Sequence, residues 1–148
     1  MLKHISIQAT LILSLIMSTH LGAFAQKNKL EGLWYNEEKT AKIEIYKATD
    51  GKYWGKIVWL KEPLRNGVPK TDDKNPNPAL RNTPTMGLVL LRHFEIDGDN
   101  GYNNGEIYDP KNGKTYSCKI TYKGDKLDVR GYIGISLIGR TTVWERTQ

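Results

Sequence analysis

The chain has 148 residues, with 22 lysines and arginines against 16 aspartates and glutamates, which gives a formal net charge of +6 at pH 7. This length leaves room for one domain with a modest core and excludes a second. The only cysteine is Cys118, which excludes a disulfide framework, so stability must come from the core.

Residues 1–25 have the three parts of a secretory signal peptide. An early positive charge at Lys3 precedes an apolar run, and the small-residue triplet Ala23-Phe24-Ala25 follows it. An uncleaved membrane anchor would need about 18 or more apolar residues, and this run is shorter. We therefore expect cleavage after Ala25 and a periplasmic or secreted mature protein of residues 26–148, not an integral membrane protein.

The mature chain is basic. Loss of Lys3 leaves 21 basic against 16 acidic residues, a formal charge of +5. Outside the cytoplasm this charge favours an anionic envelope component as partner, and we expect no nucleic acid partner. The simpler alternative is that mixed surface charge keeps a small domain soluble.

Hydrophobic residues recur with a period of two. In residues 41–47 Ala41, Ile43 and Ile45 alternate with polar neighbours, and in residues 53–60 Tyr53, Gly55, Ile57 and Trp59 are expected to share one face. Further strands are predicted at residues 30–35, 88–96, 106–108, 115–122, 127–133 and 140–146. The chain is thus predicted to be all-β, a single antiparallel up-and-down barrel of about eight strands, because closure removes exposed edges. A sandwich is the alternative.

Residues 61–85 interrupt this succession of strands. They contain five of the six prolines, which are incompatible with a central strand or a helix interior. We expect an ordered flap near one mouth of the barrel; the alternative is a solvated excursion without a ligand.

Motifs spread over the whole mature chain resemble a bacterial secreted family designated domain of unknown function 2147. They comprise Gly32-Leu33-Trp34, Asp72, Asn75-Pro76, Arg81, Tyr108-Asp109-Pro110, Gly113-Lys114-Thr115-Tyr116, Val129-Arg130-Gly131-Tyr132 and Trp144-Glu145-Arg146. The resemblance implies a small calycin-like barrel, exported, without an established activity. Gly-x-Trp with a late arginine is also similar to the lipocalin pattern, in which Trp34 would close one barrel end beneath Arg146 or Arg140, with Trp144 nearby.

Polar and aromatic residues of the flap and the last strands form the candidate ligand-binding site. They are Asp72, Asn75, Arg81, Tyr108, Asp109, Tyr116, Arg130 and Tyr132. An inward Arg130 must be paired, with Asp109, Asp72 or an anionic ligand, because an unpaired buried charge is costly. A purely structural arginine–carboxylate pair is the alternative, and Asp109 also suits a plain turn.

No catalytic, metal or cofactor site is predicted. Residues 97–101 suggest a calcium loop, but the fifth position is Gly101, so turn chemistry is favoured. His93 is the only histidine after residue 25, which leaves a zinc site or a triad resting on one residue. Cys118 is expected to be a buried small hydrophobe.

Three functions remain. The favoured one is binding of a small molecule in the envelope, partly apolar, anionic or lipid-like. The second is an envelope enzyme using Asp72, Asp73 or Asp109 beside Arg130. The third is a packed barrel that acts through protein contacts. A cavity in the barrel would favour the first, and a lumen filled by aromatic side chains the third.

Overall fold

The computed structural model describes residues 28–148. The predicted signal peptide, residues 1–25, lies outside the described residues. Within residues 28–148 no helix has the length and apolar character needed to cross a membrane.

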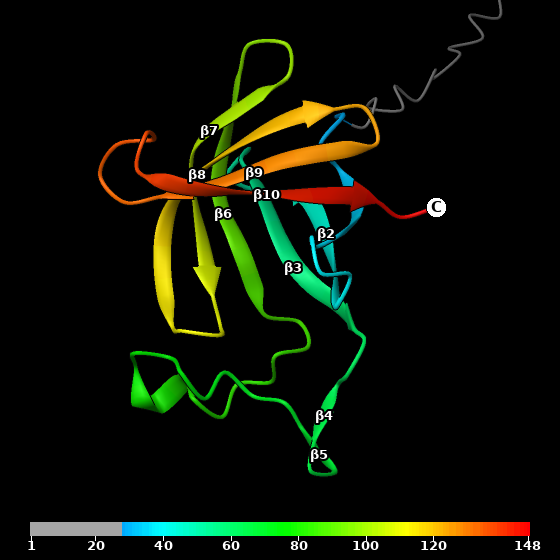
Figure 1. Cartoon of the computed structure of the whole chain (residues 1–148), viewed down its shortest axis with the longest axis vertical. Coiled ribbons are helices and arrows are strands. Elements are labelled where there is room, and N and C mark those ends of the chain that lie inside the picture. Colours follow the sequence, from blue (N-terminus) through cyan, green and yellow to red (C-terminus); the bar gives the residue numbers. More distant parts are fainter. Residues whose placement is uncertain (1–27) are drawn as a thin grey trace, which may run out of the picture.

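Eight antiparallel strands close into a barrel in the order β1-β10-β9-β8-β7-β6-β3-β2 (Figure 1). They are β1 (Gly32–Tyr35), β2 (Ala41–Lys47), β3 (Tyr53–Leu60), β6 (Val89–Asp97), β7 (Gly101–Asp109), β8 (Lys114–Lys123), β9 (Lys126–Tyr132) and β10 (Gly139–Arg146). Pairing of the first strand with the last closes the sheet, which confirms the predicted barrel and excludes the sandwich.

Alternation places the core inside the barrel. Ala41, Ile43 and Ile45 of β2 are buried, as are Leu127 and Val129 of β9, while the residues between them are more exposed. Burial of such aliphatic side chains contributes about 1.5–3 kcal/mol each and is the main source of stability in a domain without disulfides. The sequence pattern of period two therefore correctly identified these strands.

Trp59 departs from the predicted alternation. It is 37% exposed on the outer face, although Tyr53, Gly55 and Ile57 of the same strand are buried as expected. The pairing of β2 with β3 shifts by one residue between Lys42 and Ile43, and such a bulge turns every later side chain to the opposite face. The outer-face Trp59 packs edge-on against Tyr35.

One end of the barrel is closed by Trp34 and Arg146. The Arg146 guanidinium lies 4.0 Å from the centroid of the fully buried Trp34 ring, and the two residues are cross-strand neighbours. The Trp34 indole donates to the Leu30 carbonyl at 2.9 Å, and Arg146 donates to the carbonyls of Lys29 and Glu31. This confirms the predicted arginine-over-tryptophan arrangement, with Arg146 and not Arg140 as the partner.

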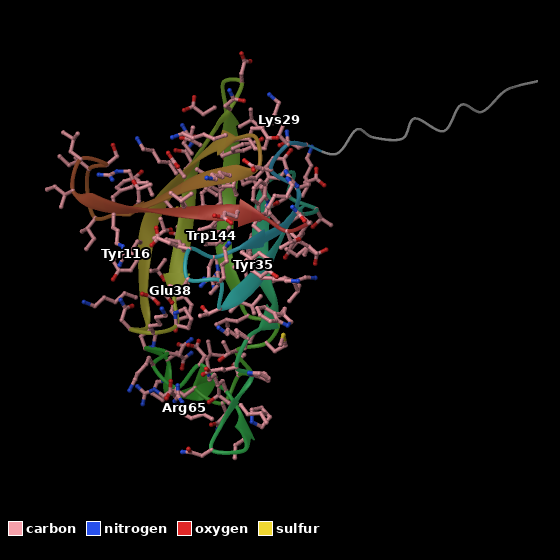
Figure 2. All side chains as sticks on the ribbon, turned by 45° about the vertical axis from the view of Figure 1, so that its right-hand side comes forward. Lys29, Tyr35, Glu38, Arg65, Tyr116 and Trp144 are labelled. Carbon is pink, nitrogen blue, oxygen red and sulfur yellow. The ribbon has the colours of Figure 1, made fainter. Side chains whose placement is uncertain are left out.

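The loops at the other end surround an open mouth. They are residues 36–40, 61–88, 110–113 and 133–138. Figure 2 shows Lys29 at the closed end, with Arg65 far from it on the segment beneath the mouth. Any site formed at the mouth is therefore built from these four connections and the strand ends that carry them.

The flap, residues 61–88, is an ordered structure. It contains the two-stranded ribbon of β4 (Leu64–Arg65) and β5 (Val68–Pro69) and the short 3-10 helix η1 (Pro78–Leu80), whose cap is Asn77. Backbone hydrogen bonds cross its base, from Asp72 to the Thr83 carbonyl and from Thr85 to the Lys70 carbonyl. The prediction of an ordered flap at one mouth is thus confirmed (Figure 1).

Candidate functional site

A cavity of about 990 Å³ opens at the mouth of the barrel. This volume lies at the upper end of the range for small-molecule sites. Its lining combines strand residues inside the barrel with residues of all four mouth loops. The space therefore lies at the mouth, and beneath it the side chains of Ile43, Val129 and Trp144 are buried in the packed lower part of the barrel.

The deep part of the cavity is apolar. Its walls are Ala41, Ile43, Ile57, Leu90, Ile107, Val129, Gly131 and Trp144. Small residues leave the space: Ala41 and Gly131 each occupy a position where a larger side chain would project into the cavity. Trp144, which the sequence placed near the closed end, lines this cavity instead, because it lies two residues before Arg146 on the same face of β10.

The rim of the cavity carries charges of both signs in equal number. The basic residues are Lys61, Arg65, Lys70, Lys111 and Arg140, and the acidic residues are Glu37, Glu38, Glu62, Asp73 and Asp109. Four of the five cations form ion pairs with rim carboxylates: Lys111 with Glu38 at 2.6 Å, Arg65 with Asp73 at 2.8 Å, Arg140 with Glu37 at 3.3 Å and Lys70 with Glu62 at 3.8 Å. The rim therefore has no strong preference for an anion.

Asp72 anchors the flap to the barrel. It is fully buried; its Oδ1 accepts a hydrogen bond from the Tyr108 hydroxyl at 2.7 Å, and its Oδ2 accepts one from Asn75 Nδ2 at 2.7 Å. Burial and the adjacent Asp72 carboxylate raise the pKa of Tyr108 to about 12, so the hydroxyl remains a donor. Three of the predicted site residues thus meet, but in a satisfied structural cluster.

The remaining flap and turn residues of the predicted site have local roles. Arg81 donates to the Asn75 carbonyl at 2.9 Å and is exposed. Asp109 accepts from the Lys111 amide at 2.9 Å, which is the turn role anticipated as its alternative. The Tyr116 hydroxyl accepts from Asn112 at 2.9 Å, and both residues lie on the cavity lining at the mouth. Figure 2 shows Tyr116 and Glu38 on the barrel side of the mouth, above Arg65.

The expectation that Arg130 points inward to a carboxylate is wrong. Its neighbours Val129 and Gly131 line the cavity, so the alternation of β9 turns Arg130 outward. Its guanidinium donates to the Ser136 and Leu137 carbonyls, at 2.7 and 3.3 Å, and to Thr141 Oγ1 at 3.0 Å. Tyr132, the last residue of β9, does reach the cavity lining.

Two carboxylates of the enzyme hypothesis, Asp72 and Asp73, are held by neighbouring side chains. Asp72 is sequestered by Tyr108 and Asn75, and the hydrogen bond from Arg65 lowers the pKa of Asp73. Likewise Lys111 lowers the pKa of Glu38, so neither rim carboxyl resembles a general acid poised near neutral pH. Among residues 28–148 no three His, Cys, Asp or Glu side chains group closely enough to hold a metal ion.

Sequence reasoning missed the apolar residues among the lining of the site. Ile107, Ile133 and Ile138 line the cavity, yet none was singled out as a candidate. Ile107 follows Gly105 by two residues, so alternation places the two on the same, inner face of the strand. Nothing in the sequence indicated that a cavity would lie beside Ile107. Cys118 is fully buried, as predicted, and burial raises the pKa of its thiol to about 12.

Comparison with known proteins agrees with this architecture. A bacterial family described as "Uncharacterized protein conserved in bacteria (DUF2147)" matches residues 32–146. Among solved structures, the chain is similar to protein HP1028 from the human pathogen Helicobacter pylori, which is described as belonging to the lipocalin family. The two share 25% identity with a TM-score of 0.71, over 80% of this chain and 83% of that one. The search among curated proteins found no match.

Proposed function

This chain belongs to the DUF2147 family of bacterial proteins, and from its barrel we propose that it binds one small, mostly apolar molecule. The observation that carries the proposal is the cavity of about 990 Å³ with apolar walls and an open mouth. Eight-stranded barrels either fill with side chains or hold one small ligand, and the mouth of this one leaves space for such a ligand.

The walls and the rim indicate the kind of ligand. An apolar body would lie against Leu60, Ile107 and Ile138, which line the cavity and keep accessible surface, and each buried methylene contributes about 0.8 kcal/mol. A polar end would lie at the rim, where Lys61 lacks an ion pair within residues 28–148. An acyl chain with a polar or anionic head has this form, and the apolar body supplies most of the affinity.

Export to the envelope belongs to the same proposal. The support for it is the triplet Ala23-Phe24-Ala25 that ends the apolar N-terminal run. A barrel with a lipid-sized cavity would have apolar ligands available in that compartment.

Titration with fluorescent acyl probes tests the proposal, comparing a long-chain fatty acid with the alcohol of the same length. We expect saturable one-to-one binding of both, because the apolar body dominates. Gly131→Leu should abolish it: a Cβ at Gly131 meets Ile107 Cγ2 at 3.4 Å without a clash, so the rest of the side chain occupies the cavity. Thr121→Leu, on the exposed face of β8, is the control and should bind like the wild type.

Native mass spectrometry of protein purified from the cell envelope measures two things: the mass of any bound ligand, and the mass of the chain, which shows where the mature protein begins. The expected spectrum shows a chain beginning at Gln26 with a bound small molecule. Equal probe binding by Gly131→Leu, or failure of the wild type to bind any acyl probe while its native spectrum shows no adduct, would contradict the proposal. A chain that begins at Met1 would contradict export alone.

A further inference from the structure

The loop between β9 and β10, residues 133–138, exposes four aliphatic side chains. Ile133 is 69% exposed, Ile135 58%, Leu137 84% and Ile138 67%. The loop contains no charged residue. Contiguous apolar exposure of this kind is uncommon on a soluble monomer and marks an interaction surface.

The loop is held in a defined conformation. The Ile133 amide donates to the Ile138 carbonyl at 3.3 Å, and the Ile138 amide donates to the Ile135 carbonyl at 3.0 Å. From the outer face of β9, Arg130 donates to the Ser136 and Leu137 carbonyls. Three hydrogen bonds from Arg130 in total stabilise the base and tip of the loop, so the apolar side chains are presented on a fixed scaffold.

The loop stands at the mouth and is continuous with the cavity. Ile133 and Ile138 line the cavity, while Ile135 and Leu137 lie between them in sequence at the tip. Figure 1 shows the loop projecting from the barrel well away from the flap. An apolar surface therefore runs from the loop tip into the barrel.

Basic residues lie near the loop. In β8, which pairs with β9, Lys114 and Lys119 lie in the half that is beside the loop end of β9, with the exposed Glu106 on the neighbouring strand β7. Lys119 lies directly across from Arg130 on the outer face, and Arg140 follows the loop. Arg140 forms an ion pair with Glu37, so Lys114, Lys119 and Arg130 supply the positive charge near the loop.

We propose that the loop of residues 133–138 inserts into a lipid bilayer containing anionic lipids and brings the barrel mouth to the membrane surface. Aliphatic side chains flanked by lysine and arginine are the combination that binds such an interface. Protein interfaces instead favour aromatic side chains and methionine at their centres, and the loop has neither. This inference does not depend on whether the cavity binds a ligand.

Co-sedimentation of the full mature chain with vesicles tests the proposal. We expect binding to phosphatidylcholine vesicles that contain phosphatidylglycerol, and weaker binding to phosphatidylcholine alone or at high salt. The double variant Ile135→Ser/Leu137→Ser should lower partitioning about tenfold or more, because it removes the two aliphatic groups at the tip. Its thermal stability should match the wild type, since both side chains are exposed.

The flap supplies a matched control. Leu64 and Val68 are 51% and 62% exposed on the β4–β5 ribbon, so Leu64→Ser/Val68→Ser removes similar apolar surface from another mouth loop. This control should bind vesicles like the wild type. The proposal is overturned if the wild type binds neither vesicle, if both double variants lose binding equally, or if the tip variant keeps full binding. It is also overturned if the wild type self-associates through the loop, with the tip variant monomeric and vesicle binding absent.

Discussion

Asp72 is a fully buried carboxylate that forms no ion pair with any cation of residues 28–148. Its two oxygens are instead satisfied by neutral donors, the Tyr108 hydroxyl and the Asn75 side-chain amide. Breaking one of these bonds leaves a buried acceptor without a partner, which costs more than the net gain of an ordinary hydrogen bond. Asp72, Asn75 and Tyr108 were predicted to bind a ligand, and their hydrogen bonds to one another give all three a structural role.

Tyr108→Phe should lower the free energy of unfolding by about 1–3 kcal/mol, because Asp72 Oδ1 loses its donor while the ring still packs. Urea denaturation of the mature protein measures this. Tyr116→Phe is the matched control: its hydroxyl only accepts from the exposed Asn112, so a change within about 0.5 kcal/mol is expected. If Tyr108→Phe changed the free energy of unfolding as little as Tyr116→Phe, Asp72 would have another donor and the prediction would be wrong.

At the scale of elements, the flap is attached to the β7–β8 hairpin by close backbone approach. Gly113 has φ +72°, and a Cβ placed there would lie 1.9 Å from the Lys74 carbonyl oxygen. Only glycine allows both this backbone conformation and this contact. Together with the Asp72–Tyr108 hydrogen bond, it ties the middle of the flap to the end of β7.

Gly113→Ala should therefore displace the flap as well as strain the turn. We expect faster cleavage at flap lysines such as Lys70 and Lys74 in limited trypsin digestion, with a loss of stability of about 1–3 kcal/mol. Gly124→Ala isolates the strain, because Gly124 has φ +76° with nothing within 4 Å of its Cβ. Faster flap cleavage in both variants, or in neither, would contradict the role of Gly113 in holding the flap.

At the scale of the whole molecule, the two ends of the barrel differ: one is packed and the other has a cavity. The closed end is packed around Trp34, Leu30 and the Arg146 guanidinium. The mouth has a cavity with a charged rim, surrounded by hydrogen-bonded loops. Stability and binding should therefore respond to different substitutions.

Trp34→Ala should lower stability by about 3–5 kcal/mol, as expected when a large buried aromatic is removed. Thermal melting with urea titration measures this loss. Trp59→Ala, on the outer face, should cost far less because Trp59 is 37% exposed. If both substitutions lowered stability by a similar amount, burial of Trp34 in the core would not be the reason for its larger expected contribution.

Local pattern and composition determined much of this protein. Alternation located the eight strands, although only residues 106–108 of β7 (Gly101–Asp109), and proline density located the flap. The resemblance of Gly32-x-Trp34 and a late arginine to the lipocalin pattern indicated the closed end but left Arg146 and Arg140 as alternatives. The strands and the flap depend on residues close in sequence, or on a pattern repeated along one strand, so they can be recognised without coordinates.

Only the tertiary structure decided which way certain side chains point and where space remains. A one-residue bulge turned Trp59 outward, and the register of β9 turned Arg130 toward the loop carbonyls and away from the cavity. The pairing of Asp72 with Tyr108 joins residues 36 positions apart. A cavity is a property of strands that meet across the closed barrel, and because its volume depends on register and on all facing side chains together, no single segment of sequence encodes it.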